Sequence, residues 1–272
     1  MFVLIRGAGD IASGAAIRLH RSGIAVVMTD TARPTAIRRT VSFSGAVISG
    51  SQRVEDVTAR LAKSPEEALE MTARGDIAVL VDEGCGCLDA LRPDALVDAI
   101  LAKRNLGTRM DMAPAVVGVG PGFTAGEDCH AVVETMRGHT LGRVYYEGSA
   151  LPNTAVPGLI GGYAGERVLR APADGVFRQV LDIGAKVEAG DVAAYVGGVP
   201  MVCTIGGVLR GILADGTPVF KGMKAGDVDP RGNVEHCYTV SDKALAVGGG
   251  VLEAVLRLSG ALNGGAGRWK TR

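Results

Sequence analysis

The chain has 272 residues, 47% of them hydrophobic, and its 29 basic and 29 acidic residues give a formal net charge of zero. This length allows two domains or one large one, and the neutral balance excludes bulk attraction to nucleic acid or to an anionic membrane. No apolar stretch reaches the ~18 residues that a membrane span needs, and the first residues read as a strand rather than a signal peptide. We therefore expect a cytoplasmic protein with neither a nucleic-acid nor a membrane partner.

The first thirty residues predict the entry of a dinucleotide-binding unit. An apolar run at 2–5 precedes the string Gly7-Ala8-Gly9, and a helical pattern follows it. Gly7 allows a tight turn, and Gly9 lets backbone N–H groups approach a pyrophosphate. A second apolar run ends in Asp30, where an acid would meet a ribose hydroxyl. An α/β turn that binds nothing is the alternative.

The charged residues around this turn allow more than one interpretation of the site. Asp10 stands at the start of the helix, where a carboxylate repels an anionic ligand unless it turns away, a cation bridges it or the site is modified. Arg33, Arg38 and Arg39 follow Asp30, and they either bind a phosphate of the nucleotide or are solvated surface residues. Asp10 and Arg33 are included among the expected cofactor contacts.

Strand and helix patterns alternate up to about residue 150. The predicted elements are a strand at 46–48, a helix from the Ser64 capping box to about 74, a strand at 77–81, a helix from Pro93 to about 103 and a strand at 115–119. The pattern favours an α/β fold: a Rossmann-like parallel sheet with helices on both faces. Ligands of such sheets bind beyond the carboxyl ends of the strands, so the loops after residues 5, 29, 81 and 119 form one candidate rim.

Five cysteines, an odd and scattered set, do not describe a disulfide framework. The only close pair, Cys85 and Cys87, lies in the loop after the strand at 77–81. These thiols either bind a soft metal, sense redox state or are two ordinary loop residues. No metal site is predicted from them.

The loop after residue 119 is the second glycine-rich feature. Gly120 and Gly122 can offer backbone N–H groups to an anion, and we expect this loop beside the first glycine turn. A helix is predicted to follow, with His130 and Glu134 on one face as a hydrogen-bonded pair, or with His139 as a metal site. Arg137 on this helix is the expected charged contact to the ligand, because its fork can grip phosphate or carboxylate.

The composition of the chain changes after residue 150. Residues 151–166 are rich in proline and glycine and are predicted to be a linker between a domain at 1–150 and a β domain at 167–240. Strings such as Gly175-Val176 and Gly207-Val208 recur 32 residues apart, which predicts two similar β halves closing on each other. Asp227 and Asp229 suit either a divalent cation or a turn. Ser241 then caps a C-terminal helix, 241–272, whose glycines at 248–250 indicate close backbone packing.

The β domain resembles the biotinyl/lipoyl barrel-sandwich fold, which implies a smaller β barrel-sandwich domain. Domains of that kind carry a prosthetic group on a lysine between their halves. Residues 192–206 contain no lysine, so we expect neither lipoate nor biotin.

Longer strings resemble one family over nearly the whole chain. Arg6-Gly7-Ala8-Gly9-Asp10, the loop 120–126, and the stretches 134–139 and 226–231 are similar to those of the selenium-dependent molybdenum hydroxylase system proteins, which are distantly similar to xanthine dehydrogenase accessory proteins. The resemblance implies an accessory protein for maturation of a molybdenum hydroxylase. It would bind a dinucleotide, either molybdopterin cytosine dinucleotide or NAD(P). Its partners would be the hydroxylase apoprotein or other maturation proteins, with a homo-oligomer also allowed.

Two alternatives stay open beside this family. One is an NAD(P)-dependent oxidoreductase, although no Tyr-x-x-x-Lys pair follows the later strands as an acid or base for hydride transfer. The other is a non-catalytic nucleotide-binding scaffold. No catalytic residue is assigned, and the sequence leaves open whether the protein is an enzyme.

Overall fold

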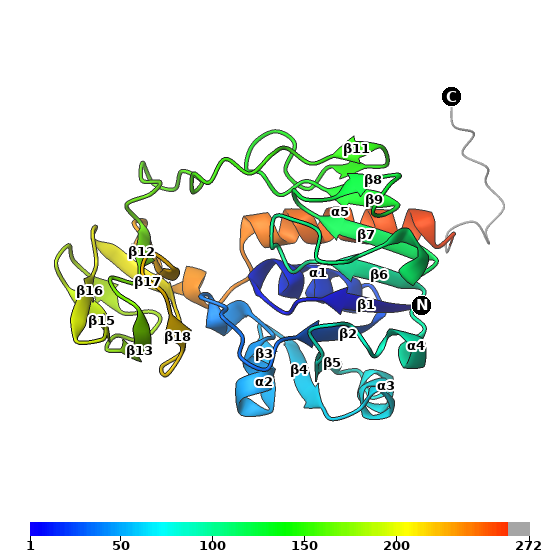
Figure 1. Ribbon diagram of the computed structural model, residues 1–272, viewed down its shortest axis with the longest axis horizontal. Helices are drawn as coiled ribbons and strands as arrows, with labels where there is room; N and C mark the ends of the chain where they lie inside the picture. The colour runs from blue at the N-terminus through cyan, green and yellow to red at the C-terminus, as the bar shows by residue number, and fades with distance from the viewer. Residues whose placement is uncertain (261–272) are drawn as a thin grey trace.

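The core of the protein is a nine-stranded mixed sheet, shown in a computed structural model that describes residues 1–260 (Figure 1). The strand order is β10–β9–β7–β6–β1–β2–β5–β4–β3. Strands from β9 to β4 in this order run parallel, while β10 and β3 pair antiparallel at the two edges. The bounds are β1 (Phe2–Arg6), β2 (Ala25–Asp30), β3 (Ser51–Val54), β4 (Val57–Ala62), β5 (Ile77–Val81), β6 (Ala95–Asp98), β7 (Ala115–Val119), β9 (Ala131–Val133) and β10 (Val144–Tyr145).

Alternate side chains of the strands fill two apolar clusters, one on each face of the sheet. In β1, Val3 and Ile5 join the cluster under helices α1 and α5, whereas Leu4 joins the cluster under α3 and α4. This alternation is what a strand buried on both faces requires. The helices are α1 (Asp10–Arg21), α2 (Gly45–Ser49), α3 (Pro65–Ala73), α4 (Leu88–Leu91) and α5 (Asp242–Leu258). Short 3₁₀ turns are η1 (Arg39–Val41), η2 (Met110–Met112) and η3 (Val234–Cys237).

Glycines let α5 pack directly on α1. A Cβ atom on Gly248 would lie 2.8 Å from the carbonyl oxygen of Gly14, and one on Gly14 would lie 2.6 Å from the Cβ of Ala244. The close backbone packing expected from the glycines at 248–250 is thus confirmed. The final residues of the predicted helix 241–272, from 261 onward, lie outside the described residues.

Residues 168–229 form two four-stranded antiparallel sheets around a separate apolar core (Figure 1). One sheet has the order β12–β19–β17–β14 and the other β16–β15–β13–β18. Their bounds are β12 (Val168–Arg170), β13 (Gly175–Gln179), β14 (Lys186–Val187), β15 (Val192–Val196), β16 (Val199–Val202), β17 (Gly207–Ile212), β18 (Pro218–Val219) and β19 (Lys224–Asp229). A further two-stranded sheet pairs β8 (Thr124–Ala125) with β11 (Gly148–Ser149).

The sequence repeat is visible in these two sheets. Each strand from β12 to β15 has its counterpart about 32 residues later, from β16 to β19, and exchanging the halves converts one sheet order into the other. Each sheet therefore combines strands from both halves. The two sheets stay separate, without closure into a barrel, within the residues that the structure describes.

Arg39 and one backbone hydrogen bond attach this unit to the segment that follows β2. Arg39 Nε donates to the carbonyl of Ile212 over 2.8 Å, and its Nη2 donates to Gln179. The backbone N–H of Ile212 donates to the carbonyl of Ile37. Because Gly211 has no side chain, β17 can approach Ile37: a Cβ atom there would lie 2.9 Å from the Ile37 carbonyl oxygen.

Three predicted elements were wrong. Residues 46–48 belong to helix α2 rather than to a strand, and the segment after Pro93 is strand β6 rather than a helix. The predicted helix after residue 126 is strand β9 followed by a loop. All three segments are short and apolar, a length at which periodicity does not separate buried strand from buried helix.

None of the helices within residues 1–260 combines the length and the apolar character that crossing a bilayer requires.

Candidate functional site

A cavity of about 630 Å³ opens at the carboxyl ends of β1, β2 and β6. Its walls include the turn from Gly7 to Gly9 with the first residues of α1, the end of β2 at 29–31, and the segment 99–101 after β6. In the sheet, β1 lies between β2 and β6, so the chain order reverses at this strand. Such a reversal opens a crevice at the carboxyl edge of a parallel sheet.

The two glycines of the turn have different roles. Gly7 has a φ of +95°, and a Cβ atom on it would lie 3.0 Å from the carbonyl oxygen of Ala99, so glycine is needed for the turn itself. Gly9 has an extended backbone and precedes α1, whose N-terminus has no side-chain cap. A Cβ atom on Gly9 would meet nothing within 4 Å. The first N–H groups of α1 thus adjoin open space, as an anion site requires.

Asp30 lies beside this turn at the end of β2. Its carboxylate accepts a hydrogen bond from the N–H of Thr31 over 2.7 Å and another from the N–H of Ala8. Burial raises the pKa of Asp30, and these two hydrogen bonds only partly oppose the shift. Asp30 therefore both holds the glycine turn and presents a carboxyl group to the cavity.

The charge of Asp10 is bridged by Arg38. Nη1 of the buried Arg38 donates to both carboxylate oxygens of Asp10, over 2.9 and 3.1 Å, and Nη2 donates to the carbonyls of His236 and Thr239. A cation thus offsets the carboxylate at the helix start, which was one of the expected solutions. Since Arg39 donates to Ile212 and Gln179 of the unit at 168–229, neither arginine is free for a phosphate. Arg33 is exposed and does not line the cavity.

The second glycine-rich loop, at 120–126, packs against residues of the cavity wall but does not line the cavity. Gly120 packs against Thr135 and Leu101, and a Cβ atom on Gly122 would lie 2.6 Å from the backbone of Arg104. Of these residues only Leu101 lines the cavity. Arg137 does not line it either: its guanidinium donates two hydrogen bonds to Asp242 at the start of α5.

His130 and Glu134, which were expected to pair on a helix, instead accept hydrogen bonds from backbone N–H groups. His130 Nδ1 accepts a hydrogen bond from the N–H of Val116. The buried Glu134 accepts hydrogen bonds from the N–H groups of Thr135, Met136 and Leu151, and so ties together the loops after β9 and β11.

One buried cation in the cavity wall escaped the sequence reasoning. Arg6, at the end of β1, lines the cavity, and its Nη1 donates to Asp98 over 3.2 Å and to Thr108 over 2.5 Å. Its Nε is buried without a partner. The available signal was an arginine at the end of a fully apolar strand, since a charge there must be paired or functional.

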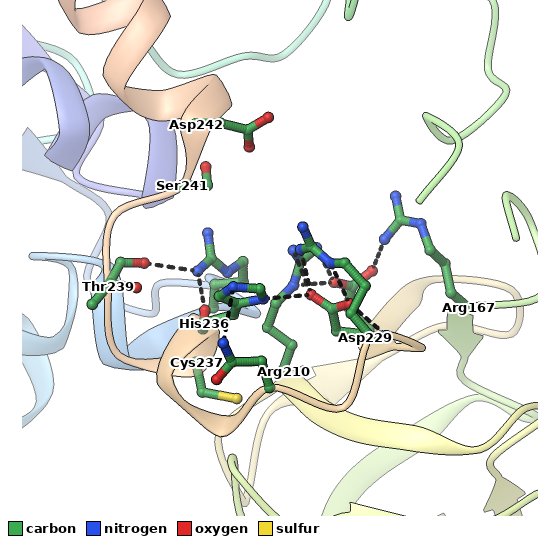
Figure 2. A network of polar contacts seen from close by, with 12 residues as sticks. Arg167, Arg210, Asp229, His236, Cys237, Thr239, Ser241 and Asp242 are labelled. Atoms are coloured by element: carbon green, nitrogen blue, oxygen red, sulfur yellow. Dashed lines mark hydrogen bonds and ion pairs between the residues drawn. The ribbon is translucent and has the colours of Figure 1, made fainter. Parts of the chain in front are cut away.

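A second set of buried charges lies at the junction of the two units (Figure 2). Arg210 donates to Asp227 and Asp229, Arg167 pairs with Asp227, and Arg231 donates two hydrogen bonds to Asp229. Burial alone would raise the pKa of Asp229, but Arg231 and Arg210 hold it at about 2. The two aspartates are therefore paired with arginines. Within residues 1–260, no group of three or more His, Cys, Asp or Glu side chains is arranged to hold a metal ion.

Comparison with known proteins gives no functional name. No family model matches the chain. The Escherichia coli K12 protein called "Uncharacterized protein YqeB" is 55% identical over 256 residues, which cover 94% of this chain and 47% of that protein. The chain thus spans about half the length of this curated relative.

The solved structures share little with the chain. The ectoine utilization protein EutE from Ruegeria pomeroyi, with product bound, is 18% identical over 30% of this chain and 27% of its own, with a TM-score of 0.23. A succinylglutamate desuccinylase from a Silicibacter species is 14% identical over 84% of each chain, with a TM-score of 0.25. An aspartoacylase family protein from Mesorhizobium loti is 12% identical over 84% of each chain, with a TM-score of 0.26. Likeness at this level carries no argument about fold or activity.

These findings correct the expected family. The curated relative is named only as uncharacterized, and the solved structures are named as desuccinylase, aspartoacylase and ectoine utilization proteins. None of these names connects the chain with selenium or with a molybdenum hydroxylase. The assignment to the selenium-dependent molybdenum hydroxylase system proteins, and the maturation role that it implied, are therefore wrong. The oxidoreductase and scaffold alternatives gain no support from these comparisons either.

Proposed function

We propose that the chain binds a nucleotide with a diphosphate group in the cavity at the glycine turn. The observation that carries this proposal is the coincidence, in one cavity, of the uncapped start of α1, the open space at Gly9 and the carboxyl group of Asp30. In this proposal residues 1–150 form a Rossmann-like domain, joined to a smaller barrel-sandwich domain at 167–240. A location in the cytoplasm and protein partners, including self-association, stay predictions.

Three parts of the cavity match three parts of a nucleotide. The N–H groups at the start of α1 suit the diphosphate, because they are unpaired donors at the positive end of a helix. Asp30 suits the ribose hydroxyls as a hydrogen-bond acceptor. Ile100 and Leu106 line the cavity and are 37% and 43% exposed, which leaves apolar surface for a base.

The surrounding charges agree with an anionic ligand. Arg6 places a buried cation in the cavity wall, and Arg38 offsets the charge of Asp10. Because Arg38 is held by the carbonyls of His236 and Thr239 and Arg39 by that of Ile212, we expect no preference for a nucleotide with a 2′-phosphate.

The test is calorimetric titration of the full chain with ADP, CDP and NAD⁺, followed by 2′-deoxy-ADP. We expect the wild type to bind at least one ribonucleotide and to bind its 2′-deoxy form more weakly. Asp30→Asn should weaken binding of the ribonucleotide by about tenfold to a hundredfold, the value of one hydrogen bond to a charged group. It should also abolish the difference between the ribo and deoxy forms.

A matched control is Asp94→Asn. Asp94 accepts a hydrogen bond from the N–H of Phe2 at the opposite end of β1, so its loss removes a carboxylate without touching the cavity. Nucleotide affinity should stay at the wild-type value. If the wild type binds none of the ribonucleotides, or if Asp30→Asn leaves both affinities unchanged, the proposal is overturned.

A further inference from the structure

Three neighbouring strands end at the cavity of the glycine turn in a fixed order. β2 lies between β1 and β5, and all three run parallel, so their carboxyl ends follow one another along one edge of the sheet. The glycine turn follows β1, Asp30 ends β2, and Glu83 and Gly84 follow β5; all of these line the cavity. Since neighbouring strands lie ~4.8 Å apart, the row from β1 to β5 is about 10 Å long. A ligand that extends along this row meets the three groups in that order.

The register of the sheet places Glu83 close to Asp30. Asp30 is the partner of Val81 in the sheet, and the N–H of Asp82 donates to the carbonyl of Asp30 over 3.0 Å. The Asp82 carboxylate turns back onto its own loop, where it accepts hydrogen bonds from the N–H groups at 86 and 87. Glu83, the next residue, is exposed and lines the cavity. Of the two carboxylates in this loop, only that of Glu83 is therefore offered to a ligand.

The wall opposite this loop comes from the segment that follows β6. Residues of this segment that line the cavity include Leu106, Gly107 and Met112. Met112 also lines a second cavity, of about 790 Å³, to which the loop after β5 contributes residues 85 and 86. The segment 106–112 thus reaches across to the loop that carries Glu83.

Glycines leave open space on both of these walls. A Cβ atom on Gly84 or on Gly107 would meet no protein atom within 4 Å. The side chain of Leu106 next to Gly107 is 43% exposed and adds apolar surface. Bare backbone and apolar surface with one polar group beside them are the surroundings that a planar aromatic base requires.

We propose that Glu83 selects a base with an exocyclic amino group, adenine or cytosine, at the nucleotide site proposed above, on which this inference rests. With the diphosphate at the start of α1 and the ribose at Asp30, the base lies at the next position of the row, beside Glu83. An ionised carboxylate only accepts hydrogen bonds. Adenine N6 and cytosine N4 carry N–H groups that donate to it, whereas hypoxanthine and uracil present a carbonyl oxygen there, which the carboxylate repels.

The experiment is calorimetric titration of the full chain with pairs of ribonucleotides that differ at this amino group. The pairs are ADP with IDP, CDP with UDP, and NAD⁺ with its hypoxanthine analogue. One hydrogen bond to a charged group changes affinity by about tenfold to a hundredfold, and the exposure of Glu83 favours the lower end. In each pair that binds, we therefore expect the amino form to bind about tenfold more tightly. Equal affinities within the pairs overturn the role of Glu83 and leave the nucleotide site standing, whereas a lack of binding by all six overturns both.

The variant Glu83→Gln separates base selection from ribose binding. Glutamine has nearly the same shape, but its amide both donates and accepts, so it can meet an amine or a carbonyl. The variant should bind the amino nucleotide about tenfold more weakly and lose the preference within the pair, while it still binds ADP more tightly than 2′-deoxy-ADP. Asp30→Asn should do the reverse and keep the preference for the amino base.

A matched control is Glu127→Gln. Glu127 is an exposed loop glutamate that does not line the cavity, so its variant should bind every nucleotide as the wild type does. If Glu83→Gln keeps the wild-type preference for the amino base, Glu83 does not select the base and the proposal is overturned.

Discussion

Replacement of Gly9 by valine is the most direct test of the cavity as a diphosphate site. A Cβ atom on Gly9 meets no protein atom within 4 Å, and the backbone there is extended at φ −71°. Valine adopts this conformation without strain, so its side chain should project into the space that the ligand would occupy. The variant thus blocks the ligand while leaving the protein free of clashes.

The size of the effect follows from the contacts that would be lost. A diphosphate moved away from the start of α1 loses one or two hydrogen bonds from backbone N–H groups, each worth about 1.5 kcal/mol or more when the acceptor is charged. Affinity should therefore fall between about tenfold and more than a hundredfold, since ~1.4 kcal/mol is one factor of ten. Folding should suffer much less: an apolar residue in place of glycine at the N-cap costs about 1 kcal/mol.

Calorimetry with ADP measures the loss of affinity, and urea unfolding measures the loss of stability. The matched control is Gly165→Val, the same substitution at an exposed loop glycine that also has no neighbour within 4 Å and that does not line the cavity. It should bind ADP as the wild type does. If Gly9→Val binds within twofold of the wild type, the diphosphate does not lie at this turn.

Three further predictions concern packing and charge. Gly248→Ala should lower the free energy of unfolding by about 1–3 kcal/mol, because the new methyl group overpacks against α1. Gly249→Ala, where the methyl group meets open space, should raise the free energy of unfolding by up to ~1 kcal/mol. Urea unfolding that ranks the two variants the other way contradicts the packing argument. With a folded pKa of about 2 against ~3.9 unfolded, Asp229 should contribute about 2–3 kcal/mol of stability that is present above pH ~4 and lost as the pH falls towards 2. Asp229→Asn should therefore flatten the decline of unfolding free energy below pH 4, and an unchanged slope would refute the assignment. Arg38→Met should weaken ADP binding by leaving Asp10 unpaired, and Asp10→Asn in the same protein should restore most of it; equal affinities in all three proteins would show that this charge is irrelevant to the ligand.

Local patterns were enough to place the glycine turn beside Asp30. A strand, a turn and a helix within thirty residues leave the chain few choices, and parallel strands bring their carboxyl ends to the same edge of a sheet. The repeat at 32 residues and the glycines of α5 were readable for a similar reason, because each reflects a packing requirement repeated along the chain.

The secondary structure of short apolar segments could not be predicted in this way. Residues 95–98 form a strand because they hydrogen-bond to β1 on one side and to β7 on the other. Nothing within the segment itself distinguishes it from a buried helix. The same reason applies to α2 and β9.

The sequence by itself determined the turn, the acid beyond it, the internal repeat and the lack of a lysine for a prosthetic group, because each depends on residues close together in the chain or equivalent in a repeat. Only the tertiary structure decided what the charged residues do. Arg38 reaches carbonyls 198 and 201 positions away, Arg137 pairs with Asp242 at 105 positions, and Arg6 meets Asp98 between neighbouring strands. Long cationic side chains pair with groups that are near in space but far apart in the sequence, so a local sequence pattern cannot identify their partners.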